Sequence, residues 1–264
     1  MNALLAAIFS KGSITIVDGD KGGVGKSFLA RLLGDWMLTR GLSVLAVDAD
    51  QRNPDFYRVF AALTESRFVN LRADEGNGFA DIIDLMDKSE TPVNILISMP
   101  AGIGEQQDRY GAVFVEALAQ LGVPINWFWV INNERDSTNL LRHQLENGGM
   151  KDATSLFVVR NLFFGTEDKF GDYNNSNTRR MVHESGKGLT IDMPKMKTDI
   201  VAALAKENMT LTRAIAQNKL RLFDRVEGQK WCESMFGTLD ALTKSPTGAR
   251  LCLAAPEAEQ TATA

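Results

Sequence analysis

The sequence predicts an α/β protein with a doubly wound, mostly parallel sheet flanked by helices and followed by C-terminal helices. Short apolar, β-branched runs alternate with longer segments whose apolar residues recur every three or four positions, as in amphipathic helices. The short runs are apolar on both faces, which is typical of parallel strands covered on both sides. Hydrophobic residues make up 44% of the 264 residues, which allows a sizeable core and excludes global disorder.

The first 160 residues hold most of the expected elements. The first strand is expected at 13–17, and an amphipathic helix at 27–39 is expected to end at Gly41. A second buried strand should follow at 42–47. Further strands are expected at 68–71, 93–97, 125–131 and 155–159, with helices between them at 78–86, 113–121 and 138–146.

The alternation fades in the rest of the chain. Residues 163–186 are polar and rich in Asn, Gly and Asp, so an insertion-like loop region is expected there, and loops of that length are often functional. One last strand is expected at 189–191. Helices should follow from residue 198, with Gly228 as a break between them.

The chain contains no internal repeat and no Pro/Ser-rich linker. Residues 1–245 are therefore expected to form a single domain. Residues 246–264 are rich in Ala, Thr, Glu and Pro and are expected to be a disordered tail.

The net charge and the small numbers of Cys and His exclude several classes of function. A net charge of -4 excludes a uniformly basic nucleic-acid binder, although a local basic face remains open. Two Cys and two His are too few for a disulfide framework or a Cys/His zinc site, and are typical of a reducing, cytoplasmic location. No run approaches the roughly 18 apolar residues that cross a bilayer. The apolar start, 1–9, is interpreted as a packing segment rather than a signal.

A glycine-rich loop between the first strand and the first helix carries the strongest functional signal. Glycines allow backbone amides to surround a phosphate, and the dipole of the following helix favours an anion. In this P-loop context Lys26 should reach the β- and γ-phosphates of a nucleotide, and the Ser27 hydroxyl should ligate Mg²⁺. The residues expected to bind the nucleotide are Asp20, Gly22, Gly23, Val24, Gly25, Lys26, Ser27 and Phe28.

The loop differs from an ordinary P-loop in two positions. Asp20 replaces the usual first glycine, and Lys21 adds an early second lysine. The string Lys-Gly-Gly-Val-Gly-Lys-Ser resembles the deviant Walker A motif of the ParA/MinD family of ATPases. That resemblance implies ATP as the ligand and an ATP-dependent homodimer in which Lys21 reaches the nucleotide of the partner. A cation supplied in this way would offset phosphate charge. Without the resemblance, Lys21 is only a second phosphate-facing cation.

Two acids end the second predicted strand. Acids at the carboxyl end of a parallel strand face the ligand crevice. The segment from Asp48 to Pro54 resembles the switch I region of the same family, although its proline lies further along than usual. The resemblance implies that Asp50 orients the attacking water and that Asp48 helps to organise Mg²⁺. A solvated strand end or a helix cap is the alternative interpretation of both acids.

The fourth predicted strand ends without the acid of a Walker B motif. Ser98 stands where the resembling family has a carboxylate that holds the Mg²⁺ shell through water. Either Asp48 compensates and hydrolysis is slow, or the protein binds ATP and barely turns it over. Gly102, in the loop that follows, is expected by analogy to sense the γ-phosphate.

Base recognition has two candidates, both at strand ends. Asn161 closes the strand at 155–159, and the family resemblance implies a contact with adenine near this point. A second candidate is the Asn-Asn-Glu-Arg segment at 132–135, on the rim of the nucleotide site. The sequence has no Asn-Lys-x-Asp signature of guanine recognition, so ATP is favoured over GTP.

The resemblance implies that ATP-driven dimerisation positions or segregates DNA or a protein complex, as in plasmid partition or conjugative transfer. Residues 195–230 carry eight basic and four acidic side chains, and nonspecific DNA binding needs only such cations. A solvated helix face explains them equally well. A protein partner is also open, through 163–186 with Arg179 and Arg180. The acidic, Pro-interrupted C-terminus argues against membrane targeting.

Three functional hypotheses remain. The leading one is a slow, dimerising ATPase with Lys21, Lys26 and Asp50 as catalytic residues and ATP and Mg²⁺ as cofactors. A weakly hydrolysing or non-hydrolysing scaffold is the second, because of Ser98. The third is a metabolic P-loop ligase or kinase, against which Lys21 argues, because such enzymes normally lack the early lysine.

Overall fold

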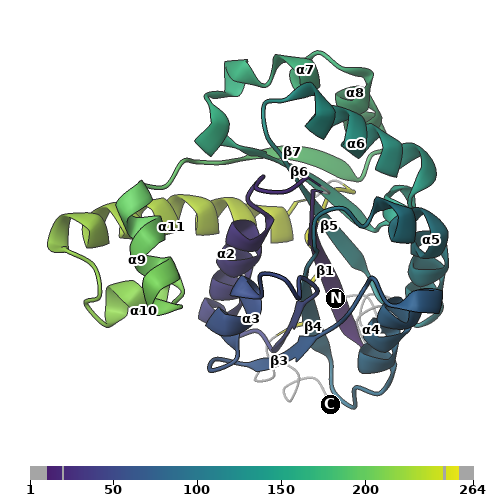
Figure 1. Ribbon diagram of the computed structural model, residues 1–264, viewed down its shortest axis with the longest axis horizontal. Coiled ribbons are helices and arrows are strands. Elements are labelled where there is room, and N and C mark those ends of the chain that lie inside the picture. The colour runs from purple at the N-terminus through teal and green to yellow at the C-terminus, as the bar shows by residue number, and fades with distance from the viewer. Residues whose placement is uncertain (1–10, 20, 246–247, 256–264) are drawn as a thin grey trace.

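The computed structural model describes residues 11–19, 21–245 and 248–255, and its centre is a seven-stranded sheet (Figure 1). The strands lie in the order β3-β2-β4-β1-β5-β6-β7, and every neighbouring pair is parallel. The predicted doubly wound α/β fold is therefore confirmed. The strands are β1 Gly12–Asp18, β2 Val44–Asp48, β3 Glu65–Phe68, β4 Val93–Ser98, β5 Ile125–Ile131, β6 Ser155–Asn161 and β7 Gly188–Met193.

Helices cover both faces of the sheet. One face packs on α2 Lys26–Thr39, α3 Asp55–Phe60 and the end of α11 Leu222–Thr243, and α9 Thr198–Glu207 and α10 Leu211–Ala216 extend this apolar cluster away from the sheet (Figure 1). The other face packs on α4 Asn77–Asp87, α5 Gly104–Gln120, α6 Arg135–Asn147, α7 Gly171–Asn174 and α8 Asn177–Glu184. The central strands are buried on both faces, which explains why the sequence shows continuous apolar runs instead of alternation.

Several parts of the chain differ from the sequence prediction. The third strand lies at Glu65–Phe68 instead of 68–71, because this exposed edge strand lacks a continuous apolar run. Residues 163–186 are not a loop throughout, since they contain α7 and α8, held by the buried side chains of Phe170, Tyr173 and Val182. Gly228 does not break a helix. It lies inside α11, where its missing side chain leaves room for Leu211 of α10.

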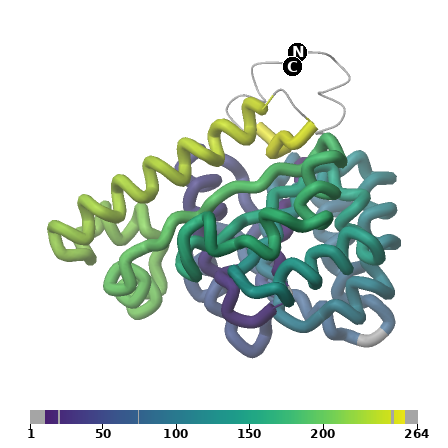
Figure 2. Tube along the Cα trace, turned by 90° about the horizontal axis from the view of Figure 1, so that it is seen from above, coloured from purple at the N-terminus to yellow at the C-terminus, as the bar shows by residue number. Residues whose placement is uncertain are grey.

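Helices α9, α10 and the first part of α11 form an arm beside the body of the molecule (Figures 1 and 2). Figure 2 shows α11 as one long helix that begins in the arm and ends against the body. Polar contacts join α2 to the arm and to the end of α11, because Asp35 accepts a hydrogen bond from the amide of Thr212 at 2.9 Å and Arg40 pairs with Asp240, near the end of α11, at 2.7 Å. The arm is therefore connected directly to the helix that follows the glycine-rich loop.

The structure describes no helix long and apolar enough to cross a membrane. The predicted tail, 246–264, lies partly outside the described residues. Its described part, 248–255, packs on the body, with Leu251 and Ala254 buried. The amide of Ala254 donates to Asn94 at 2.8 Å, and the amide of Cys252 donates to Asn126 at 2.9 Å. These eight residues are therefore not the disordered tail that their composition predicts.

Candidate functional site

The glycine-rich loop joins β1 to α2 in a conformation that only glycine adopts readily. Gly23 and Gly25 have φ angles of 78° and 108°, in the left-handed region that glycine enters without a steric penalty. A Cβ atom on Gly25 would lie 2.5 Å from the side-chain nitrogen of Asn161. No described side chain caps the start of α2, which is where a bound anion is stabilised. The loop therefore fits the phosphates of a nucleotide.

The two lysines of the loop have different surroundings. Lys26 is buried, and its Nζ donates to the backbone oxygen of Lys21 at 2.7 Å. The Lys21 side chain is partly exposed and its Nζ donates to the carboxylate of Glu134, the residue before α6. This hydrogen bond and the charge of Lys21 lower the pKa of Glu134. Lys26 thus belongs to the interior of the loop, whereas Lys21 is held at its rim. Asp20 lies outside the described residues.

Asp48 organises the turn that follows β2. Its side chain is fully buried, and its two oxygens accept the backbone amides of Asp50 at 3.0 Å and Tyr57 at 2.9 Å. Burial raises the pKa of Asp48 to about 6 despite these hydrogen bonds. The carboxylate of Asp50 accepts the amides of Arg52 and Asn53 at 3.1 and 3.3 Å. The two predicted acids therefore share one turn, with Asp48 as its anchor and Asp50 nearer the solvent.

Ser98 lies at the end of β4, between the acids and the loop. It is buried, and it stands opposite Val17 of β1 and Asp48 of β2 in the strand register. The described residues contain no group of three His, Cys, Asp or Glu side chains that holds a metal. The Ser27 hydroxyl and the Asp48 carboxylate are oxygen donors of the kind that Mg²⁺ prefers, with phosphate oxygens and water completing its shell. This donor set fits Mg²⁺ together with a nucleotide, not a free-standing metal site.

Other predicted binding residues support the loop from behind. The side-chain amide of Asn161 donates to the backbone oxygen of Val24 at 2.8 Å, and its oxygen accepts the amide of Phe163 at 3.1 Å. Asn161 thus contacts the P-loop itself. The Phe28 ring packs edge-on against Trp231 of α11, with centroids 5.8 Å apart. The Phe28 ring therefore links α2 to α11. Because the ring is engaged there, Phe28 would contact a nucleotide through its backbone.

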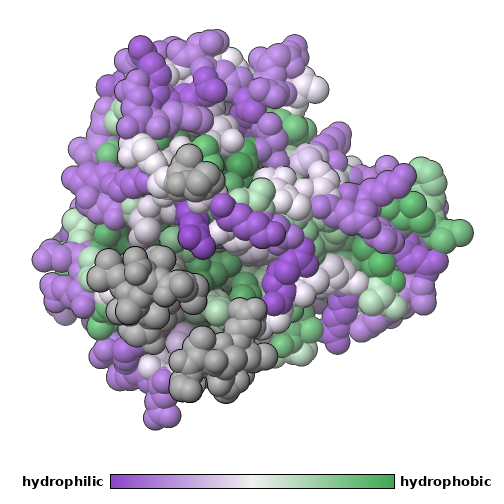
Figure 3. Space-filling view, turned by 180° about the vertical axis from the view of Figure 1, so that it is seen from behind, coloured by the Kyte–Doolittle hydropathy of each residue, from purple (hydrophilic) through white to green (hydrophobic). Residues whose placement is uncertain are grey.

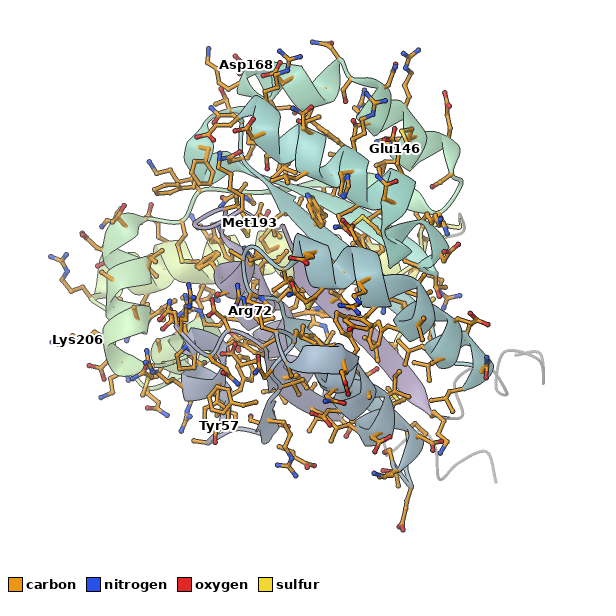
Figure 4. The ribbon with its side chains drawn as sticks, turned by 45° about the vertical axis from the view of Figure 1, so that its right-hand side comes forward. Tyr57, Arg72, Glu146, Asp168, Met193 and Lys206 are labelled. Atoms are coloured by element: carbon orange, nitrogen blue, oxygen red, sulfur yellow. The ribbon has the colours of Figure 1, made fainter. Side chains whose placement is uncertain are left out.

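The segment at 132–135 also lies beside the loop. Asn132 accepts the amide of Glu134 at 3.1 Å, which holds the carboxylate near Lys21. The side-chain amide of Asn133 donates to the backbone oxygen of Phe164 at 2.9 Å and ties the segment to the start of 163–186. Met193, labelled in Figure 4 at the end of β7, completes this side, with its methyl carbon 3.6 Å from the Cβ position of Gly25.

Sequence reasoning missed one acid at the base of the loop. Asp18 ends β1 and is fully buried. Its carboxylate accepts the amide of Gly19 at 2.6 Å and the side-chain amide of Gln107 of α5. The signal was present, since an acid at the carboxyl end of an apolar parallel strand faces the ligand crevice.

A second missed contact joins two loops at the same edge. Arg72, labelled in Figure 4, donates to the backbone oxygen of Ala101 in the loop after β4. That loop contains Gly102, whose φ angle is 67°. No sequence pattern marks Arg72, because its partner is a backbone atom 29 residues away.

Ion pairs within the arm neutralise part of its basic charge. Among the described residues, five basic residues of 195–230 have no ion pair, whereas Glu227 is the one acidic residue of this range without one. The net charge of the arm therefore remains positive. The pairs are Lys197 with Asp199 and Asp224, Lys219 with Glu207, and Arg221 with Asp199 and Asp224. The five remaining bases are Lys195, Lys206, Arg213, Arg225 and Lys230. Lys206 is labelled at the outer side of the arm in Figure 4.

The contacts of Arg160 explain how the segment 163–186 is held. Arg160, at the end of β6, is nearly buried and donates twice to the Asp192 carboxylate, at 2.7 and 2.9 Å. It also donates to Asn174 of α7 at 2.8 Å. Paired, planar guanidinium contacts of this kind fix geometry as well as charge. The segment 163–186 is therefore anchored next to the loop site.

Comparison with known proteins gives matches of two kinds. The family model of the CobQ/CobB/MinD/ParA nucleotide-binding domain matches residues 15–152, just over half of the chain. Protein MobD of Acidithiobacillus ferrooxidans is 33% identical over 219 residues, which cover 83% of this chain and 92% of MobD.

One solved structure supports the fold. The septum site-determining protein MinD of Pyrococcus horikoshii OT3, solved with Mg-ADP, has a TM-score of 0.51 at 14% identity, over 84% of this chain and 95% of MinD. The cell division ATPase MinD of Pyrococcus furiosus has a TM-score of 0.47 at 18% identity, over 84% and 99%. Together with the loop geometry, the family match and the identity to MobD show that this chain belongs to the CobQ/CobB/MinD/ParA family of nucleotide-binding domains.

Proposed function

We propose that the protein is an ATPase that binds ATP with Mg²⁺, dimerises in the ATP-bound state and serves as a slow switch that positions DNA or a protein complex. The observation that carries this proposal is the separation of the two loop lysines. Lys26 lies inside the loop, whereas Lys21 is held at the rim by an ion pair with Glu134 whose side chains are both partly exposed. Exposed ion pairs contribute little free energy, so a phosphate of a second subunit would compete for Lys21 effectively.

The proposed roles follow the placement of the side chains. The amides of 22–25 and the Nζ of Lys26 would bind the phosphates, and Ser27 with Asp48 would hold the cation. Mg²⁺ would supply charge neutralisation at the phosphates. Asp50, on the outer side of its turn, would orient water for hydrolysis. The identity to MobD and the family match support a role of the kind that the family resemblance implies, in plasmid partition or conjugative transfer.

Light scattering in saturating ATP and in saturating ADP tests the proposal. We expect a dimer with ATP only, no dimer for Lys21→Ala, and a long-lived ATP dimer with slower hydrolysis for Asp50→Ala. Arg142→Ala, which removes an exposed ion pair of α6 with Glu146, is the matched control and should dimerise like the parent. A parent protein that stays monomeric in ATP would contradict the proposal.

A scaffold that binds ATP without appreciable hydrolysis is the second candidate, and Ser98 favours it. The buried hydroxyl gives the metal shell no charge, unlike a carboxylate. Measuring phosphate release with and without nonspecific duplex DNA separates the two candidates. A DNA-stimulated rate supports the switch, whereas ATP binding with no release above the Lys26→Ala background supports the scaffold.

Nonspecific DNA binding by the arm is a further part of the proposal. Lys219 and Arg221 already form ion pairs with acidic residues. A triple variant that neutralises the basic side chains of Arg213, Arg225 and Lys230 is therefore more informative than one that neutralises Lys219 and Arg221. We expect ATP-dependent, salt-sensitive binding that weakens in this variant. Unchanged affinity would place any DNA surface elsewhere.

A further inference from the structure

The end of the arm exposes three large apolar side chains within about one helical turn. Leu222, Phe223 and Val226 of α11 are 68%, 70% and 47% exposed. They are half of the six large exposed hydrophobic side chains in the described part of the chain. Figure 3 shows apolar surface at the end of the projecting part, next to hydrophilic side chains. We define Leu222, Phe223 and Val226 as the arm patch.

The fold itself does not need the arm patch. The same turn of α11 is held from its opposite side, where buried Asp224 accepts from Lys197 at 2.5 Å and Gly228 lies against Leu211. A helix that is already packed on one face gains nothing from apolar side chains in water on the other. Clusters of exposed apolar residues with a polar rim mark interaction sites.

The charge around the arm patch indicates the kind of partner. Lys197 lies over the Phe223 ring, with its Nζ 5.2 Å from the centroid. Arg225 and Lys230 lie on the same helix and have no ion pair among the described residues. Glu227 is the one acidic residue of 195–230 that likewise has no ion pair there. An apolar centre with a positive surround is complementary to an apolar surface bordered by carboxylates.

We propose that the arm patch docks an acidic amphipathic helix of a partner protein. The apolar face of that helix would cover Leu222, Phe223 and Val226, and its carboxylates would face Arg225 and Lys230. Recognition of amphipathic helices likewise uses apolar anchors that recur at helical spacing. The inference deepens the proposed function, because it supplies the surface through which such a switch holds its protein cargo, and it rests on that function for this role.

Two other ligands fit the arm patch less well. A membrane of anionic lipids would meet the carboxylate of Glu227, the residue after Val226, and that of Asp199, which pairs with Arg221 beside Leu222. The phosphates of duplex DNA would contact the basic side chains of the arm. They would leave the three apolar side chains in water, because phosphate contacts use cations and hydrogen-bond donors.

Fluorescence anisotropy with a labelled model peptide of about 18 residues tests the proposal, since shorter isolated helices are marginal. The peptide carries Leu and Phe on one helical face and Glu on the other. We expect saturable binding to the full chain without nucleotide, and a loss of about tenfold or more in the triple variant L222S/F223S/V226S, because anchor side chains dominate such contacts. A peptide with Lys in place of Glu should bind about tenfold more weakly than the acidic peptide.

A matched control separates the arm patch from general surface apolarity. Val113 of α5 is 65% exposed and lies on another helix, so Val113→Ser should leave peptide binding unchanged. All substituted side chains are exposed, and equal thermal unfolding of the variants and the parent would show that the fold is retained. Because the measurement omits nucleotide, a failure of ATP-dependent dimerisation does not affect it, and the two results are read separately.

Three outcomes would overturn the proposal. The first is equal peptide affinity in the triple variant and the parent. The second is no peptide binding together with flotation on vesicles of phosphatidylserine and phosphatidylcholine that the triple variant loses, which would make the arm patch a membrane surface. The third is no peptide binding together with self-association in sedimentation that the triple variant loses, which would make it an interface between copies of this chain.

Discussion

The amine of Lys21 and the carboxylate of Glu134 are bound to each other across 113 residues of sequence. The contact joins the P-loop to the segment before α6, and it holds the early lysine within its own subunit. A lysine that must reach a second subunit has to leave this contact first. The ion pair therefore opposes the proposed reach of Lys21 to the nucleotide of the second subunit. A variant that removes the ion pair tests this role.

Glu134→Gln should lower the ATP concentration that gives half-maximal dimerisation by about two- to fivefold, because exposed ion pairs contribute little. Light scattering during an ATP titration measures this shift. Glu146→Gln breaks a comparable exposed pair with Arg142 on α6 and serves as the control, with no shift expected. A higher ATP requirement in Glu134→Gln would mean that the carboxylate presents Lys21 to the partner instead of restraining it.

Ser98→Asp should increase the rate of ATP hydrolysis on the order of tenfold, because it supplies a negative ligand for the Mg²⁺ shell. Without nucleotide it should lower the free energy of unfolding by about 2 kcal/mol, since the new carboxylate is buried opposite Asp48. Phosphate release and thermal unfolding with and without Mg-ATP measure both effects. The neutral Ser98→Asn should increase neither the rate nor the stabilisation by Mg-ATP. Equal rates for Asp and Asn would place the hydrolytic limit elsewhere.

Gly25→Ala should weaken ATP binding about tenfold or more. The residue has a φ angle of 108°, and its new Cβ would push against the side chain of Asn161, which holds Val24. Left-handed backbone costs about 1–2 kcal/mol outside glycine, and about 1.4 kcal/mol corresponds to a tenfold change. Gly237→Ala, in an open part of α11, is the control and should bind ATP like the parent. Titration calorimetry checks both, and normal affinity in Gly25→Ala would argue against the phosphate cradle.

Asp35 makes the stability of the α2–arm contact depend on pH. Burial raises the pKa of Asp35, although hydrogen bonds from Thr212 partly oppose the rise. Above 3.8, the ordinary pKa of the unfolded chain, the folded protein therefore holds a proton that the unfolded chain has lost. This contribution to the free energy of unfolding falls as pH rises from 3.8 to the folded pKa, and above that pKa no further loss occurs.

Asp35→Asn should remove this decline, because asparagine does not titrate. Denaturant unfolding at several pH values measures the free energy for the parent, for Asp35→Asn and for Asp81→Asn. Asp81 is an exposed acid of α4, and its variant should follow the pH dependence of the parent. A parallel pH dependence in Asp35→Asn and the parent would show that Asp35 titrates alike in both states.

The sheet and the loop follow from local patterns in the sequence. Continuous apolar strands such as 125–131 are recognisable because both of their faces are buried, and the helices between them keep a period of 3.6. The phosphate loop is a local feature as well, since its glycines, lysine and serine are consecutive. The exposed edge strand Glu65–Phe68 was misplaced and the helices within 163–186 were missed, because tertiary contacts hold these elements more than a local pattern does.

Which distant groups meet depends on how the chain packs in three dimensions. Glu134 beside Lys21, Asn161 beneath Val24, and Asp18 bound to Gln107 are side-chain contacts over 89 to 137 residues, which no local pattern encodes. The arm patch is a similar case. The spacing of Leu222 and Val226 predicts an apolar helical face, but whether that face is buried depends on which side of α11 the rest of the chain covers. Asp224 and Gly228 occupy the covered side, so the apolar side chains are left in water.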